Sequence, residues 1–179
     1  MPKILENPRD KILTEAREMI KENGYEKLSM RNLAKACNIG LGTLYNYFKN
    51  KHSIVLEIVR LDWEASLNRL EKVRGFSGTF EEKMKFIYDE LENYLYNHID
   101  IFILLYNEEK NKPNHFNDNI FGSLYLLTDD IINYHKENGD LNINLDTRRI
   151  SRFIVSNIIT IIKSHAFSFD DLICILIKK

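Results

Sequence analysis

The segment GLGTLYNYFKNK, residues 40–51, combines hydroxyl, amide and small side chains and ends in lysines. On a helix, where successive residues lie about 100° apart, Leu44 and Phe48 share one face and are predicted to be buried. Gly42 and Asn46 then point away from that face. Asn46 carries the donor and acceptor that match an adenine edge, and Gly42 would let the backbone approach closely. The spacing therefore predicts an uncharged surface that can form hydrogen bonds with the base edges of DNA.

Basic residues surround this predicted surface. Residues 27–56 contain five Lys or Arg residues and no Asp or Glu. A polyanion can approach such a region without repulsion, and lysines and tyrosine hydroxyls commonly contact phosphate oxygens. The same charges could also form an ordinary solvated face. The residues predicted to contact DNA are Ser29, Arg31, Leu41, Gly42, Thr43, Tyr45, Asn46, Tyr47, Lys49 and Lys51.

Short helices must position these side chains. Apolar residues recur at helical spacing almost everywhere, and no strand pattern stands out. Ser29 is predicted to cap a short helix, and Asn38 to form the turn after it, because asparagine tolerates a left-handed backbone. A third helix is expected over residues 41–48, and Asn50 is expected to cap a long helix that ends near residue 74. Two short helices joined by a tight turn form a helix-turn-helix.

The stretch LSMRNLAKACNIGLGTLYNYFKNKHSIV resembles the DNA-binding head of TetR/AcrR transcriptional regulators. That family begins its motif with Thr/Ser-x-Arg and an alanine, here Ser29, Arg31 and Ala34. After the turn it continues with G-T-L-Y-x-Y-F-x-[NS]-K, which matches residues 42–51. The resemblance covers about residues 8–60. This sequence departs from the pattern in two places, since Asn38 replaces the usual glycine of the turn and Gly40 replaces the usual serine.

The rest of the chain is predicted to be a second helical domain. Gly75-Phe76-Ser77-Gly78 is the one clear break, so we assign residues 1–50 to the DNA-binding domain, 51–74 to a connecting helix and 75–179 to the second domain. One helix is expected to begin at Thr79 with a capping box, and a short helix is expected near residues 101–107. After a loop at 108–114, a long helix should end at residue 138, another should span 146–165, and the last should begin at Ser168. The fold class is therefore all-α. The resemblance implies that the second domain binds an effector and forms a dimer.

Two groups of residues are candidates for these roles. Aromatic side chains of the second domain could line an apolar effector cavity or could be solid core, and both interpretations stay open. These are Phe86, Tyr94, Phe102, Tyr106, Phe121 and Tyr125. The last two helices carry more apolar surface than a small domain needs, and by resemblance they form half of a four-helix dimer interface. The interface candidates are Phe153, Ile154, Ile158, Ile161, Ile162, Leu172, Ile173 and Leu176.

Other classes of protein have little support in the sequence. The five histidines show no metal-ligand spacing, and there is no catalytic triad order or glycine-rich phosphate loop, so we expect no metal, no cofactor and no enzyme. The first residues lack a signal-peptide pattern, and no apolar run approaches the roughly 20 residues of a membrane span. Two distant cysteines suit a reducing compartment. We therefore expect a cytoplasmic protein that does not enter a membrane.

These features predict a bacterial-type, ligand-responsive transcriptional regulator. It would bind a palindromic operator as a homodimer, with half-sites about one helical turn, roughly 34 Å, apart. It would act as a repressor that a small, partly apolar effector releases from DNA. The alternative is a helical protein-interaction module without DNA binding. A small-molecule enzyme is a further rival, which the missing catalytic residues argue against.

Overall fold

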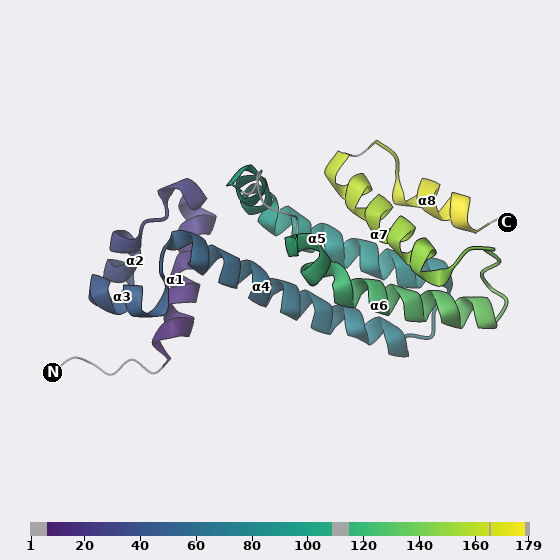
Figure 1. Ribbon diagram of the computed structural model, residues 1–179, viewed down its shortest axis with the longest axis horizontal. Coiled ribbons are helices and arrows are strands. Elements are labelled where there is room, and N and C mark those ends of the chain that lie inside the picture. The colour runs from purple at the N-terminus through teal and green to yellow at the C-terminus, as the bar shows by residue number, and fades with distance from the viewer. Residues whose placement is uncertain (1–6, 109–114, 165, 178–179) are drawn as a thin grey trace. The chain divides into compact units, whose positions relative to one another are not determined.

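The computed structural model describes residues 7–108, 115–164 and 166–177, and it describes side chains in these ranges except over 99–121 (Figure 1). The all-helical fold is confirmed, because the described residues contain helices, turns and no strand. The elements are α1 (Pro8–Asn23), η1 (Tyr25–Lys27), α2 (Met30–Ala36), α3 (Leu41–Tyr47), α4 (Lys51–Leu70), η2 (Glu71–Gly75), α5 (Phe80–Glu108), α6 (His115–Glu137), α7 (Thr147–Ser164) and α8 (Phe169–Leu176), where η denotes a 3₁₀ helix.

The chain divides into two compact units, each with its own core. The first, here called the head, comprises Met1–Asp62 and Asp100–Glu108, and the second, here called the body, comprises Trp63–Ile99 and Glu109–Lys179. Helix α4 contributes its first part to the head and its last part to the body.

In the head, α1 packs on α2, and α2 packs on α3. Pro8 begins α1, where its missing N–H costs nothing, and Asp10 in the first turn complements the helix dipole. Ile12 and Ala16, one turn apart, are completely buried. Gly24 ends the helix at φ 78°, a conformation that favours glycine. The apolar stripe of α1 therefore packs into the core of the head, against α2.

Side-chain caps predicted from the sequence are present at the starts of four helices, α2, α4, α5 and α8. The Asn50 Oδ1 atom accepts from the Ser53 amide at 2.8 Å at the start of α4. At α5, Thr79 accepts from the Glu82 amide at 3.2 Å, and Glu82 accepts from the Thr79 amide at 2.8 Å. Ser168 begins α8 with the same reciprocal pair. These capping boxes satisfy amides that the helix itself leaves unpaired.

The prediction of a separate helix near residues 101–107 is wrong. Helix α5 runs without interruption over Phe80–Glu108. No glycine or proline interrupts it, and polar side chains before residue 99 bond to the turn below. The Asn97 amide donates to the Asn93 carbonyl at 2.8 Å, and the His98 ring contacts the Tyr94 carbonyl at 2.8 Å. Polar residues such as Asn97 and His98 do not by themselves end a helix.

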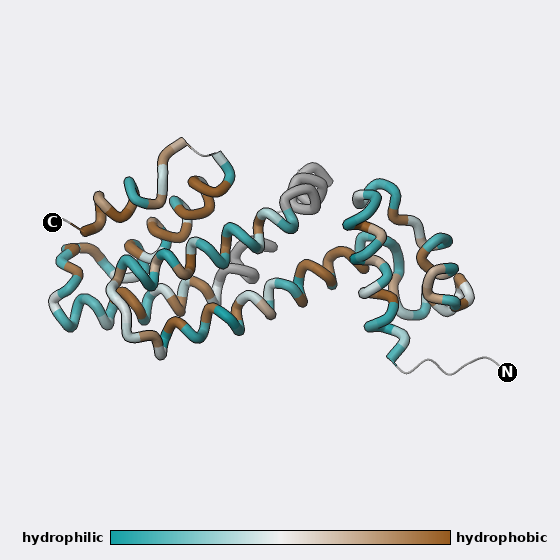
Figure 2. The backbone as a smooth tube through the Cα atoms, turned by 180° about the vertical axis from the view of Figure 1, so that it is seen from behind, coloured by the Kyte–Doolittle hydropathy of each residue, from teal (hydrophilic) through white to brown (hydrophobic). Residues whose placement is uncertain are grey.

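The body core comes from α5, α6, α7 and α8 together with the end of α4. Helix α6 packs on α7, and α7 packs on α8. Near the start of the unit, the Trp63 and Tyr94 rings lie 4.9 Å apart between centroids. Brown and teal residues alternate along these helices in Figure 2, which is the pattern of amphipathic helices with one buried stripe. Within the described part of the chain, no helix has the length and apolar character needed to span a bilayer.

Candidate nucleic-acid interface

The turn between α2 and α3 sets the exposed face of α3. Ser29 caps α2 by accepting from the Asn32 amide at 3.2 Å. Asn38 has φ 57°, so the prediction of a left-handed asparagine in this turn is confirmed. Gly40 precedes α3 at φ −65°, and a Cβ there would meet the Thr43 hydroxyl at 3.5 Å, an ordinary contact. The backbone at position 40 therefore does not require glycine. Position 38, in contrast, requires a residue that tolerates positive φ.

The faces of α3 are divided as the spacing predicted. Leu44 and Phe48 are buried, with 0% and 3% exposure. On the other side Tyr45 is 50% exposed and Tyr47 is 42% exposed, and Leu41 is also at the surface. Gly42, Thr43 and Asn46 are exposed as well. The helix is thus anchored by two apolar residues and presents hydroxyl, amide and glycine groups to the outside.

The three basic residues predicted to contact DNA differ in the contacts that they make within the chain. Arg31 and Lys49 are exposed, and neither forms an ion pair with any described residue. Lys51 is half-buried, and its ammonium lies 4.4 Å from the centroid of the Tyr25 ring. This cation–π contact orients the lysine without neutralising its charge. Three positive charges near α3 are therefore available to an anion.

The sequence analysis did not identify Arg9, in the first turn of α1, as a residue that contacts the end of the DNA-binding motif. Its guanidinium is 5.4 Å from the centroid of the Phe48 ring and 3.0 Å from the Glu57 carboxylate. Arg60 also bonds to Glu57, at 2.9 Å. The hydrogen bond from Arg60 is the main cause that lowers the pKa of Glu57, and the charge of Arg9 adds to it, against the opposing effect of burial. Arg9 lies outside the motif around α3, so nothing in that motif could have indicated it.

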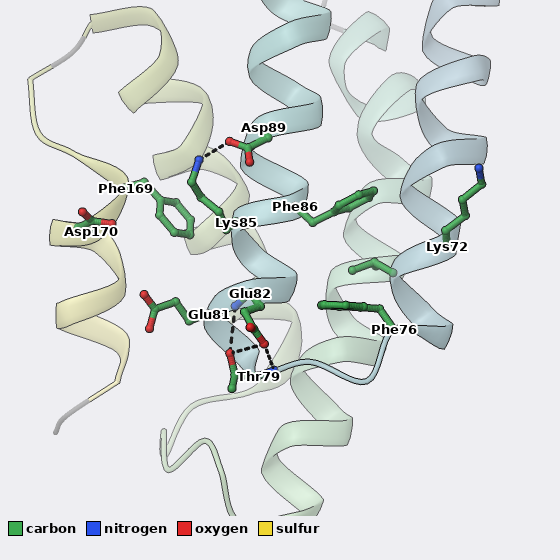
Figure 3. Close-up of a pocket in the computed structure, with 11 residues that line it drawn as sticks. Lys72, Phe76, Thr79, Glu81, Glu82, Lys85, Phe86, Asp89, Phe169 and Asp170 are labelled. Atoms are coloured by element: carbon green, nitrogen blue, oxygen red, sulfur yellow. Dashed lines mark hydrogen bonds and ion pairs between the residues drawn. The ribbon is translucent and has the colours of Figure 1, made fainter.

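A cavity of about 770 Å³ lies in the body, around the first turns of α5 (Figure 3). Phe76, Phe86 and Phe169 contribute aromatic surface. Charged side chains of both signs also line the cavity, namely Lys72, Lys85, Glu81, Glu82, Asp89 and Asp170. Phe86 is one of the predicted effector residues.

The other predicted effector residues are placed differently. Tyr94 is 2% exposed and packs against Trp63, which is a core position, and Tyr125 is half-buried. Phe102, Tyr106 and Phe121 lie outside the residues whose side chains are described. The role of all these aromatic residues in effector binding stays a prediction.

Most of the predicted dimer-interface residues are buried within a single chain. Phe153 is 48% exposed, and Ile162 and Leu176 are half-buried, so these three are accessible to a partner. The buried members are Ile154, Ile158, Ile161, Leu172 and Ile173. They hold α7 and α8 in the body, and any partner would meet the outer side chains first. The dimer interface stays a prediction.

In comparison with known proteins, the head is similar to a family of bacterial regulators. Residues 12–58 match the family described as bacterial regulatory proteins, tetR family. The HTH-type transcriptional regulator UidR of Escherichia coli K12 is 40% identical over 68 residues, which are 37% of this chain and 35% of UidR. IcaR, the negative regulator of the Staphylococcus aureus biofilm operon icaADBC, is 27% identical over 124 residues, which are 66% of this chain and 62% of IcaR. The chain thus spans less than two thirds of these relatives.

Solved structures share the fold over nearly the whole chain. A TetR/AcrR regulator from Thermobifida fusca has a TM-score of 0.71 at 17% identity, covering 94% of this chain and 93% of that one. FadR of Bacillus subtilis, solved in complex with stearoyl-CoA, has a TM-score of 0.65 at 22% identity, covering 91% and 92%. At such identities the likeness concerns the fold. The interaction-module alternative finds no support among these relatives, which are all named as regulators.

Proposed function

We propose that this chain, whose N-terminal domain belongs to the tetR family of bacterial regulatory proteins, is a ligand-responsive transcriptional repressor. It binds a palindromic operator as a homodimer, and a small, partly apolar effector releases it. It acts in the cytoplasm and carries out no catalysis. Residues 1–50 form the DNA-binding domain in this proposal, and residues 75–179 bind the effector and the second subunit.

One observation carries the proposal, namely the division of α3 between an anchored and an exposed face. Leu44 and Phe48 fix the helix from below, while Tyr45 and Tyr47 remain largely exposed beside Asn46. A helix that only faces water normally carries charged residues there. The exposed groups suit the major groove, where asparagine pairs with adenine and apolar groups touch thymine methyls.

The cations around α3 account for affinity in this proposal. Arg31, Lys49 and Lys51 contact phosphates, and they position α3 without reading sequence. The first amides of α4, which begins at Lys51, favour an anion at the same place. Ser29 and Thr43 add hydroxyl donors at the starts of α2 and α3. Base contacts along Leu41, Gly42 and Asn46 then determine the operator sequence.

Release by an effector is a shift of population between two states of the dimer. An effector that binds better to the state unable to span both half-sites draws molecules away from the operator. The cavity in Figure 3 supports an apolar ligand body, since Phe76, Phe86 and Phe169 line it. Helix α4 contributes residues to both units, which makes it the natural element to pass such a change to the head.

Selection of bound duplexes from a random DNA pool tests the proposal. The enriched sequences should contain an inverted repeat with half-sites about one helical turn, or a multiple of it, apart. A gel shift with the enriched duplex and with a scrambled duplex of equal length should show at least about a thousandfold preference at matched salt. Failure to enrich any common sequence, together with no shift of random duplex at low salt, would exclude DNA binding.

A further inference from the structure

The cavity of Figure 3 has a surplus of negative charge that its own lysines do not neutralise. Four acids and two lysines line it, so two negative charges are in excess at neutral pH. The acids are Glu81, Glu82, Asp89 and Asp170, and the lysines are Lys72 and Lys85. A cleft lined mainly by one sign of charge attracts ligands of the opposite sign. The charge of this cavity therefore favours a cation over an anion.

Two of the four acids already have structural partners. Asp89 pairs with Lys85, which lies one turn earlier on α5. Glu82 accepts from the Thr79 amide at 2.8 Å and from its hydroxyl at 3.2 Å, as part of the capping box. These two carboxylates therefore stabilise the chain itself.

The other two acids, Glu81 and Asp170, have no such role. Both are exposed, and neither forms an ion pair or a side-chain hydrogen bond with a residue that the structure describes. Lys72 does not face them, because it lies on the opposite side of the cavity, on η2 (Figure 3). The carboxylates of Glu81 and Asp170 are therefore available to a ligand.

The helix ends beside these acids reduce the negative surplus without removing it. Glu81 lies in the first turn of α5, and Asp170 lies in the first turn of α8. The N-terminus of a helix is equivalent to about half a positive charge. The two helix ends therefore offset about one of the two surplus charges. About one negative charge remains, which a monocation would balance.

Charged and aromatic groups are divided between the two sides of α5 in this cavity. Figure 3 shows Glu81, Asp170 and Phe169 on the side that faces α8, and Phe76 and Phe86 on the side that faces η2. Phe76 is 48% exposed and Phe86 is 40% exposed, so both rings offer apolar surface to a ligand. The cavity therefore suits a molecule with one charged end and an apolar body.

An ammonium of the chain already lies against aromatic rings on the α8 side. The Lys85 Nζ atom is 4.8 Å from the centroid of the Tyr88 ring and 5.8 Å from that of Phe169. Such contacts are favourable for ammonium groups in general. Because Asp89 pairs with Lys85, the charge of this lysine is largely cancelled for a second cation nearby.

We propose that this cavity binds an organic monocation with an aromatic or other apolar body. Its ammonium pairs with the carboxylates of Glu81 and Asp170, and its body extends across the first turns of α5 to Phe86 and Phe76. The volume of about 770 Å³ is within the range of pockets for drug-sized ligands. The role of this ligand as an effector rests on the proposed function, whereas its binding does not depend on that function.

Three probes that share one body test this assignment on the full-length protein in the absence of DNA. They are phenylbutylamine, phenylbutanol and phenylbutyrate, each with the ring at the far end of the chain, and their polar ends are cationic, neutral and anionic at neutral pH. Titration followed by NMR should give the lowest Kd for the amine. This Kd should be at least about fivefold below that of the alcohol, because hydrogen bonds between charged groups are stronger than neutral ones. The carboxylate should bind most weakly.

The double substitution Glu81→Gln with Asp170→Asn removes both charges and keeps the shapes of the side chains. It should raise the Kd of the amine at least about fivefold and change that of the alcohol by less than about twofold. Both residues are exposed and outside the capping contacts, so the fold should be preserved. Glu22→Gln with Glu26→Gln is the matched control, since it removes two exposed acids from the head. It should leave all three Kd values unchanged.

Phe86→Ala tests the apolar end of the site. It should weaken binding of the amine and of the alcohol by the same factor, about threefold or more, because it removes aromatic surface that both bodies contact. Circular dichroism checks that each variant is folded.

Several results would overturn the assignment. One is an alcohol or a carboxylate that the wild type binds as tightly as the amine, and another is no binding of any probe. A Kd of the amine that the double substitution at positions 81 and 170 leaves unchanged would also refute it. The comparison among probes uses the wild type alone, so it decides the question even where a variant is unfolded. Because no DNA is present, a negative result here leaves the proposed DNA binding intact, and a failed operator selection leaves this site intact.

Discussion

At the scale of single residues, the α3 surface depends on which aromatic side chains are anchored and which are free. Tyr45 and Tyr47 are exposed because Leu44 and Phe48 occupy the buried positions of the same helix. Lys51 is held by the Tyr25 ring, and Phe48 by the guanidinium of Arg9. Contacts of this kind set the direction of a side chain before DNA arrives, which lowers the entropy lost on binding.

Tyr45→Ala should weaken operator binding by about 10- to 100-fold, because base and phosphate contacts of this kind contribute roughly 1–3 kcal/mol. Alanine favours a helix, so the stability of the head should hardly change. Fluorescence anisotropy with the selected operator measures the effect. Tyr96→Ala is the control, since Tyr96 is 81% exposed on α5 in the body. Unchanged affinity in Tyr45→Ala would contradict the assignment of this face.

The salt dependence of operator binding should report the cations near α3. If Arg31, Lys49 and Lys51 of two subunits neutralise about six phosphates, log K should fall with log salt with a slope near −5. Lys49→Ala should make that slope less steep by about 2, because it removes one contact from each subunit. Lys72→Ala, in η2 of the body, should leave it unchanged. A flat dependence in the wild type would remove the phosphate role.

Glu57 should make the head sensitive to acid. The hydrogen bond from Arg60, with the charge of Arg9, lowers the pKa of Glu57 in the folded state. Its stabilising contribution is therefore complete above the unfolded pKa of about 4.3 and is lost as the pH falls through the folded pKa.

Urea unfolding of the wild type and Glu57→Gln tests this dependence. The wild type should be more stable by about 1 kcal/mol or less near neutral pH, since the ion pairs are partly exposed. The difference should shrink as the pH falls from the ordinary glutamate value of about 4.3 through the lowered pKa of folded Glu57. A difference that stays constant with pH would show that Glu57 does not act through its charge.

At the scale of elements, the sequence predicts helix faces and caps well but does not predict reliably where a long helix continues. The faces of α3, the left-handed Asn38 and the caps at Asn50, Thr79 and Ser168 follow from spacing and side-chain chemistry, and the structure confirms them. The unbroken α5 was missed, since the sequence analysis expected a separate helix near residues 101–107. Contacts between distant segments, such as Lys83 with Tyr134, leave no trace in sequence spacing.

The turn between α2 and α3 offers a direct test of backbone strain. At φ 57°, glycine at position 38 should match or exceed the stability of asparagine, and alanine should lose about 1 kcal/mol. Urea unfolding of Asn38→Gly and Asn38→Ala gives the order. Equal midpoints for alanine and asparagine would mean that the turn relaxes to another conformation.

At the scale of the whole molecule, the structure changes which residues should be substituted to test dimerisation. The family resemblance and the apolar surface of the last two helices group Phe153, Ile158 and Ile161 as interface residues, but Ile158 and Ile161 are buried in the body of one chain. Sequence periodicity identifies an apolar stripe and cannot say whether the same chain or a partner covers it. The family resemblance is confirmed by the match of residues 12–58, while the surface that joins two subunits stays a prediction.

Phe153→Glu should therefore give a folded monomer, because a charge would oppose association at an exposed position without entering the core. Ile158→Glu should instead lose helical structure, because it buries an unpaired charge. Sedimentation velocity and circular dichroism separate these outcomes. Leu145→Glu, a similar change at a site 56% exposed before α7, should remain a dimer. A dimeric Phe153→Glu would move the interface elsewhere.

The rates at which the two cysteines react with a thiol reagent should report how often the head opens. Cys37 is buried in the core of the head, where burial raises the pKa of its thiol, whereas Cys174 on α8 is exposed. A thiol reagent should label Cys174 at once and reach Cys37 only when the head transiently opens. The slow phase of labelling would then time the breathing of the head in the native protein, and bound operator should lengthen it.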